Sequence, residues 1–302
     1  MKKKNNKRVS PPFGYFGSKN KIALQICKNL PPHNCWVEAF CGSAAITLSK
    51  QPAPIEVIND LDDEIVNLFK QLRINSGKLS KAVSLTPYAR QELTSARKEE
   101  KKINNLERAR RFLVSAMMAV NGIFGEQKGG FSYSLSYARN NRDARVNRWY
   151  NLPQRLEEVV ERLRSVRIEK RNAITLLRDY IDRPATLIYL DPPYFAERTN
   201  GYNIEANDEE FHRSLLKLAN KAKCMIFISA YDNKLYRTVL TTKKGWSSKR
   251  IQTITKDATG KSHNRTEVVW MNKHFKKAQK LNRVPIRLSK EERKMNKINP
   301  SR

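Results

Sequence analysis

The sequence has few features of a membrane, secreted or metal-binding protein. Its apolar runs are no longer than a strand, and charged residues interrupt every longer stretch, which argues against a transmembrane helix. The basic start MKKKNNKRVSPP has no apolar segment behind it and does not resemble a secretory signal. The four cysteines form no C-x-x-C pair and the four histidines are scattered, so metal-ligand spacing is absent. We therefore expect a cytoplasmic protein with reduced thiols, no metal and no membrane partner.

Two common nucleotide-binding signatures are also missing, and no internal repeat is visible. The segment from Val37 to Ala44 reads as a strand, a loop of small residues and a helix start, but it is not G-x-G-x-x-G, so a dinucleotide fits poorly. Gly17-Ser18-Lys19 resembles a piece of a phosphate loop without the rest of its pattern, which argues against a nucleoside triphosphate site. A turn and a helix cap at Ser18 explain that segment equally well.

Acidic residues are scarce. Asp and Glu total 29 against 59 Lys and Arg, which gives a formal net charge of +30 over 302 residues. Folding concentrates this charge, and a polyanionic partner relieves the repulsion. Nucleic acid is the first candidate partner and a membrane surface the second.

The order of expected elements indicates an α/β protein with an interruption. Helices and strands alternate up to about residue 76, and this rhythm returns at Val166. The stretch between is helix-rich, charged around residues 97–111, and continues into an expected loop over residues 121–151. The expected strands are 36–40, 55–60, 166–168, 186–190 and 225–229, with a closing antiparallel pair at 248–254 and 266–271; the expected helices include 20–30, 44–50, 62–73, 174–180 and 208–221.

The most informative segment is Asp191-Pro192-Pro193-Tyr194, directly after the apolar run Thr186–Leu190. Because proline cannot continue a central strand, the Asp191 carboxylate is expected at the carboxyl end of a buried strand, where open α/β sheets bind ligands. A carboxylate, a neighbouring backbone carbonyl and an aromatic ring suit a planar base that carries an amino group. A simple strand-ending turn is the alternative reading.

A second acidic position, Asp60, ends the expected strand 55–60. An acidic residue at the end of the second strand is well placed to bind ribose hydroxyls. Capping of the following helix, shared among Asp60, Asp62 and Asp63, is the alternative.

Six stretches together resemble the Dam-like (D12) class of DNA adenine-N6 methyltransferases. They are PFGYFGSKNKI, VEAFCGSAAI, VINDLDDEIVNLF, YLDPPY, FISAYDN and RTEVVWMN, in the order of that class over about residues 11–272. The resemblance implies a Rossmann-like, mostly parallel seven-stranded sheet with an antiparallel closing hairpin. It divides the chain into a basic N-terminal tail (1–10), a discontinuous methyltransferase domain (11–76 and 166–275), a mainly helical target-recognition insert (77–165) and a basic C-terminal tail (276–302).

The resemblance also implies S-adenosylmethionine as cofactor and assigns residues to two sites. The expected catalytic residues, which form the pocket of the target adenine, are Asp191, Pro192, Pro193 and Tyr194, and the expected cofactor residues are Tyr15, Lys19, Glu38, Phe40, Gly42, Asp60 and Asn172. Two positions depart from the family pattern. Ala44 replaces the second glycine of F-x-G-x-G, and we expect it to begin the helix rather than to need a positive φ. Arg171-Asn172-Ala173 stands where relatives often have an acid, so Asn172 or the backbone would bind the cofactor's adenine.

The implied substrate is duplex DNA, from which the adenine is flipped and stacked on Tyr194. Arginines of the 97–111 cluster, of the loop behind it and of both tails can contact phosphates. Because Asn suits adenine and Arg suits guanine, the candidate base readers are Asn121, Arg139, Asn140, Asn141 and Arg142. We expect a monomer, with a dimer on DNA as the alternative.

Three other functions were weighed. A methyltransferase for cytosine N4 or for RNA is the nearest alternative, and Asp before Pro-Pro-Tyr favours adenine by analogy only. A cytosine carbon-5 enzyme needs a cysteine nucleophile, and no cysteine follows a proline here. A catalytically silent DNA-binding protein of the same fold would carry a damaged Asp-Pro-Pro-Tyr segment, which this chain does not.

Overall fold

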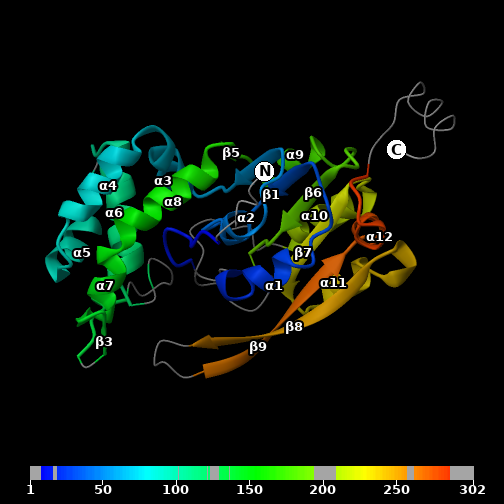
Figure 1. Ribbon diagram of the computed structural model, residues 1–302. Coiled ribbons are helices and arrows are strands. Elements are labelled where there is room, and N and C mark those ends of the chain that lie inside the picture. Colours follow the sequence, from blue (N-terminus) through cyan, green and yellow to red (C-terminus); the bar gives the residue numbers. More distant parts are fainter. Residues whose placement is uncertain are drawn as a thin grey trace, which may run out of the picture.

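The computed structural model describes residues 8–15, 19–100, 102–120, 122, 129–135, 137–193, 209–256 and 262–285; of residues 253–256 and 262–265 it describes the backbone. Its centre is a seven-stranded sheet in the order β5-β2-β1-β6-β7-β9-β8 (Figure 1). The strands are β1 (Cys35–Glu38), β2 (Ile55–Asn59), β5 (Val166–Glu169), β6 (Thr186–Leu190), β7 (Met225–Tyr231), β8 (Ser247–Lys256) and β9 (Ser262–Met271).

The pairing of the strands confirms the expected Rossmann-like sheet. Strands β5, β2, β1, β6 and β7 run parallel, while β9 pairs antiparallel with β7 and with β8. Strand β1 lies between β2 and β6, so the strand order reverses at this point. Ligands of open α/β sheets bind at such a reversal, beyond the carboxyl ends of the strands.

Helices cover both faces of the sheet because its central strands are apolar on both sides. Helices α1 (Ala23–Cys27) and α12 (Lys273–Leu281) pack on one face, where Ile26 and Phe275 join a cluster with Trp36 and Tyr189. Helices α9 (Ala173–Arg178), α10 (Glu209–Lys221) and α11 (Lys234–Val239) pack on the other. The remaining short elements of this part are η1 (Lys19–Lys21), α2 (Ala45–Ser49) and η2 (Thr242–Lys244).

The insert is mainly helical, as expected. Its elements are α4 (Ser76–Leu85), α5 (Arg90–Ala96), α6 (Asn105–Met118), β3 (Ala138–Arg139), β4 (Arg142–Asp143), α7 (Ala144–Tyr150) and α8 (Leu152–Leu163). Of these, α4, α6 and α8 pack against α3 (Asp63–Ile74). One cluster of buried side chains joins Ile58 of the sheet and Leu68 of α3 to Leu113 and Val159 of the insert. The insert therefore shares its core with the helix that precedes it.

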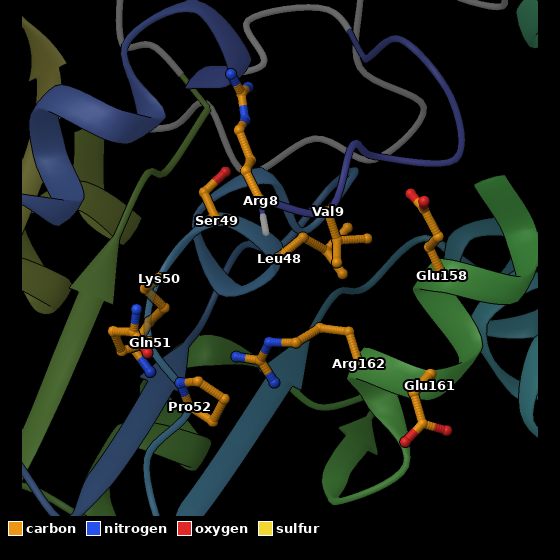
Figure 2. A pocket seen from close by; sticks show the side chains of 10 residues that line it. All are labelled: Arg8, Val9, Leu48, Ser49, Lys50, Gln51, Pro52, Glu158, Glu161 and Arg162. Carbon is orange, nitrogen blue, oxygen red and sulfur yellow. The ribbon is translucent and has the colours of Figure 1, made fainter. Parts of the chain in front are cut away.

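A buried ion network fastens the insert to the sheet. The Glu56 carboxylate of β2 accepts from Lys50 Nζ at 2.5 Å and from Arg162 Nη1 of α8 at 2.5 Å. Figure 2 shows the adjoining cavity of about 350 Å³, which is lined by the chain around Val9, the end of α2 and helix α8. This cavity lies at the C-terminal end of α2, whereas the expected cofactor loop precedes the N-terminus of that helix.

Two expectations about elements are wrong, and one helix was not expected. The segment 121–151, expected as a loop, contains the β3–β4 hairpin and α7, which begins because Asp143 accepts from the backbone N–H groups of Arg145 and Val146. The expected C-terminal tail at 276 starts inside α12, whose residues Phe275 and Ala278 are buried. Helix α11 was not expected at all; Asn233 caps it by accepting from Tyr236 N.

Candidate active site

The loop between β1 and α2 is built around Gly42, which has a left-handed φ of +47°. A Cβ on this residue would lie 2.8 Å from Cδ1 of Tyr15, so glycine is required both by the backbone and by the packing of the tyrosine ring. The Gly42 N–H donates to Oδ2 of Asp60 at 2.8 Å. Three expected cofactor residues, Tyr15, Gly42 and Asp60, therefore lie together beyond the ends of β1 and β2.

Ala44 corrects one expectation. It is left-handed, with φ 54° and ψ 35°, and α2 begins only at Ala45. Because its Cβ crowds the backbone in this conformation, an alanine here costs about 1–2 kcal/mol relative to the right-handed region. The expectation that alanine simply starts the helix was wrong: the loop keeps the geometry that glycine serves in the family pattern.

Glu38 ends β1 and braces it against α2. The side chain is 2 % exposed, and its Oε2 accepts from Thr47 N at 3.0 Å and from the Thr47 hydroxyl. The same hydroxyl accepts from Trp36 Nε1 at 2.7 Å. Burial raises the pKa of Glu38 to about 7. These contacts tie the end of β1 to α2, and so hold both ends of the expected cofactor loop.

Asp60 does not cap helix α3, which was the alternative role considered for this residue. The N-cap of α3 is Asp62, whose Oδ1 accepts from Glu64 N at 2.9 Å. Asp60 Oδ1 accepts instead from Asp62 N at 3.0 Å, and burial raises the pKa of Asp60 to about 6. A carboxylate has about four lone-pair sites, so two backbone bonds leave acceptor capacity for a ligand.

Asn172 and Phe40 lie at the rim of this region. Asn172 is exposed, and its Oδ1 caps α9 by accepting from Ile174 N at 2.9 Å. Phe40 packs edge-to-face against Phe211 of α10, with ring centroids 6.2 Å apart. Asn59, which the sequence did not single out, is buried and donates to Ala39 O and Arg171 O, each at 3.0 Å. It ties the ends of β1, β2 and β5 together.

Asp191 follows β6 and forms an ion pair with Lys19, Nζ to Oδ1 at 2.8 Å. The two side chains are 18 % and 5 % exposed, so water screens the pair little. Lys19 Nζ also lies 3.6 Å from Oε1 of Glu267, which accepts from the buried Ser229 hydroxyl at 2.7 Å. Lys19 was expected at the cofactor; the structure places it between two carboxylates at the catalytic segment.

The charges of this cluster depend on one another. Burial alone would lower the pKa of Lys19, but Asp191 and Glu267 outweigh it and raise that pKa, which keeps the ammonium charged. Burial raises the pKa of Asp191 to about 6, against the opposing effect of Lys19. Asp191 is therefore ionised at neutral pH, because the cation 2.8 Å away compensates its charge.

Glu267 and Ser229 were missed as site residues, although both lie in stretches that carry the family resemblance. Glu267 contacts both Lys19 and Ser229, so the cluster joins η1, β7 and β9. Nothing in the local sequence indicates which carboxylate would meet a lysine almost 250 positions away. Pro192 is buried and Pro193 half-buried, while Tyr194 lies outside the described residues.

The expected base readers lie on the β3–β4 hairpin. Asn140 and Asn141 form its turn with φ of 52° and 55°, flanked by the pairs Ala138↔Asp143 and Arg139↔Arg142. Positive φ at both central positions favours asparagine, so the turn itself accounts for this residue type. Arg139 and Arg142 are exposed, and the Arg142 guanidinium lies 4.2 Å from the centre of the Tyr150 ring. Asn121 lies outside the described residues.

Two further observations bear on a nucleic-acid surface. Large apolar side chains near this hairpin face solvent; they are Tyr133 (56 % exposed), Leu135 (92 %) and Tyr137 (67 %). In contrast, the arginines of α6 are compensated within the protein. Arg108 pairs with Glu64 at 2.5 Å, and Arg110 and Arg111 pair with Glu107 at 2.7 and 2.9 Å. The hairpin arginines are better candidates for phosphate contacts than the 97–111 cluster.

No group of three or more His, Cys, Asp or Glu side chains among the described residues is arranged to hold a metal ion. None of the described helices has the length and hydropathy needed to cross a bilayer.

Known proteins similar to this chain include solved structures of methyltransferases. One of them is a proposed RNA methyltransferase from Pyrococcus horikoshii (7 % identity, TM-score 0.39, 86 % of this chain and 85 % of that one). A SAM-dependent methyltransferase from Agrobacterium tumefaciens shares 10 % identity with a TM-score of 0.37 over 84 % of this chain and 60 % of that one.

The family comparison is more specific. A model of one methyltransferase family matches residues 15–277, which include the loop at Gly42, the Lys19–Asp191 pair and Glu267. The cofactor of such enzymes is S-adenosylmethionine. The chain belongs to the D12 class N6 adenine-specific DNA methyltransferase family.

Proposed function

We propose that this protein transfers a methyl group from S-adenosylmethionine to N6 of an adenine that is flipped out of duplex DNA. The observation that carries the proposal is the Asp191 carboxylate, held at the end of β6 by Lys19 at the point where the strand order reverses. The proposal keeps the expectation of a cytoplasmic monomer, and it favours adenine over cytosine N4 or RNA because of the family to which the chain belongs.

The chemistry requires acceptors for the amino group of the base. The lone pair of the exocyclic nitrogen is delocalised into the ring, which makes the nitrogen a poor nucleophile. Asp191 binds Lys19 through Oδ1, so Oδ2 can accept one N–H of the amino group, and the Pro192 carbonyl can accept the other. These acceptors favour a pyramidal nitrogen whose lone pair points outward, which is electrostatic stabilisation of the transition state.

Lys19 would act as a positioning residue in this scheme. Its ammonium keeps Asp191 ionised and fixes the carboxylate against the sheet, while Glu267, which accepts from the Ser229 hydroxyl, lies 3.6 Å from the ammonium. S-adenosylmethionine supplies the electrophilic methyl group when bound. The protein then contributes mainly alignment of the two reactants.

The cofactor would lie over the loop at Gly42. We assign its ribose to Asp60 and its methionine part to the region of Tyr15 and Lys19. Phe40 and Asn172 would border its adenine, and Glu38 would support the loop through Thr47. The Asp60 assignment is supported by its release from helix capping and by its bond to Gly42 N.

DNA would approach the same edge of the sheet. The exposed β3–β4 hairpin offers Arg139 and Arg142 for phosphates or bases, and Asn140 and Asn141 at its tip. The exposed Leu135 and Tyr137 suit insertion between base steps, which opens space for a flipped base. Tyr194 would stack on that base. Asn121 remains a candidate base reader.

Substitution of Asp191 tests the proposal. Asp191→Ala should abolish methyl transfer, while the affinity for DNA changes little because phosphate contacts dominate binding. Methyl transfer is measured with labelled cofactor, and affinity by fluorescence anisotropy on the same duplex. Retained turnover would remove Asp191 from the mechanism.

Asp60→Ala is the companion variant for the cofactor site. It should weaken cofactor binding and leave DNA binding intact, as isothermal titration with each ligand can show. Unchanged cofactor affinity would reduce Asp60 to a residue that only braces the loop.

A further inference from the structure

Strands β8 and β9 continue well beyond the sheet. Strand β9 pairs with β7 only from Glu267 to Met271, but its pairing with β8 goes on from Gln252↔Thr266 to Lys256↔Ser262. Along these outer pairs, no described strand flanks the two. We call these residues, 252–256 and 262–266, the ribbon. Figure 1 draws it as an orange hairpin whose free end points to the lower left, the side on which the β3 hairpin is drawn.

The ribbon leaves the sheet at the reactive edge. Asp191 follows Leu190, which pairs with Ile228 of β7, and β7 ends three residues later at Tyr231, opposite Glu267. Glu267 is therefore the root of the ribbon, and it lies 3.6 Å from the lysine that binds Asp191. At about 3.4 Å per residue, the outer pairs reach roughly 17 Å past Glu267.

The composition of the ribbon does not suit a free-standing hairpin. A two-stranded hairpin alone is at best marginally stable in water. The ribbon has a single large apolar residue, Ile254, and no acidic residue, while Lys256, His263 and Arg265 are basic and the rest are Ser, Thr, Gln or Asn. Lysine on an edge strand also discourages aggregation. Yet this set as a whole consists of the residue types that contact DNA phosphates and base edges.

We propose that the ribbon is a second DNA-binding arm, which contacts the duplex beside the flipped base while the insert's β3–β4 hairpin contacts it elsewhere. A two-stranded ribbon fits the major groove of B-DNA. The proposal rests on DNA being the substrate, as proposed above. It adds a contact surface in the catalytic part of the chain, outside the insert.

Removal of two charges from the ribbon tests this. The double variant Lys256→Gln/Arg265→Gln keeps the strand and loses two cations. Loss of two phosphate contacts should make the slope of log K against log salt less negative by about 1.8 and weaken binding roughly tenfold at moderate salt. Affinity is measured by anisotropy on a fixed duplex over a series of salt concentrations.

The matched control removes the same charge far from the reactive edge. Lys277 and Lys280 are exposed on α12, which follows Asn272, whose N–H donates to Ile226 O near the start of β7. Lys277→Gln/Lys280→Gln should bind DNA within about twofold of the unaltered protein. An equal loss of DNA affinity in both double variants, or no loss in either, would contradict the proposal that the ribbon binds DNA.

A variant with a shortened ribbon gives an independent test of the proposal. Replacement of residues 253–265 by Asn-Gly closes the hairpin with a two-residue turn near the sheet. Cofactor affinity should stay unchanged and DNA affinity should fall at least as far as in the charge variant. If the unaltered protein does not methylate DNA at all, the proposed function fails. If it does and the shortened chain binds DNA equally well, only the arm fails.

Discussion

At the scale of single residues, Ala44 is where side chain and backbone conflict. Its φ of 54° places a Cβ in the left-handed region. We expect Ala44→Gly to raise the free energy of unfolding by about 0.5–1 kcal/mol, because the relieved strain exceeds the entropy that glycine loses on folding. Urea denaturation measures this. Ala45→Gly, one residue later in α2, should lower stability; a loss at both positions would contradict the left-handed geometry.

The charge of Asp191 gives a pH prediction. Asp191 offers a charged acceptor only when it is ionised, and burial raises its pKa to about 6. The acceptor is therefore lost as the pH falls through that value, and kcat/KM should decline about tenfold per pH unit below it. Lys19→Met removes the cation 2.8 Å away, so the midpoint should move to higher pH.

Rate profiles against pH for both proteins check this shift. Lys21→Met, which alters an exposed lysine two positions later, should leave the midpoint unchanged. If Lys19→Met lowers the rate equally at every pH, the titrating group is not Asp191.

At the scale of elements, the brace between β1 and α2 links stability to pH. Burial raises the pKa of Glu38 from about 4.5 to about 7 in the folded protein. The folded state thus retains a proton that the unfolded chain releases. The corresponding stability is fully present below the ordinary pKa and is lost as the pH rises through about 7.

Glu38→Gln removes that titration while its amide oxygen can still accept from Thr47 N. Between pH 4.5 and 7, stability should fall less steeply with rising pH in the variant than in the unaltered protein, by up to about 1.4 kcal/mol per pH unit. Urea denaturation across this pH range provides both curves, and parallel curves would mean that Glu38 is ionised throughout.

The elements that could be predicted from the sequence are those with strong apolar runs and punctuation. Strand β6, ended by Pro192, was expected at its observed bounds. Helix α7 was hidden because its start depends on Asp143, which ends a hairpin whose turn residues, Asn140 and Asn141, resemble a loop. Helix α12 was hidden by its lysines, since only Phe275 and Ala278 anchor it. Such elements depend on tertiary contacts more than on local pattern.

The site divides in the same way. Gly42 and Asp191 can be recognised from motifs in the sequence, whereas the partners of Lys19 depend on the order of the strands in the sheet. Glu267 meets Lys19 only because β9 returns beside β7. Sequence spacing carries no information about such a contact.

At the scale of the whole molecule, the net charge is +30, but carboxylates compensate the positive side chains in some parts more than in others. Arg108 and Arg110 of α6 are neutralised by neighbouring carboxylates. In contrast, Arg139 and Arg142 of the β3–β4 hairpin are exposed. A duplex held by the hairpin and the ribbon would place a flipped base between them, at Asp191.

The central claim is the identity of the methylated atom. Duplex DNA is incubated with the protein and S-adenosylmethionine labelled in the methyl group, then digested and analysed as nucleosides by mass spectrometry. The account predicts label in N6-methyl-2′-deoxyadenosine from the DNA, and none when Asp191→Ala is used. Label in N4-methylcytosine, or in RNA offered in parallel and not in DNA, would contradict it.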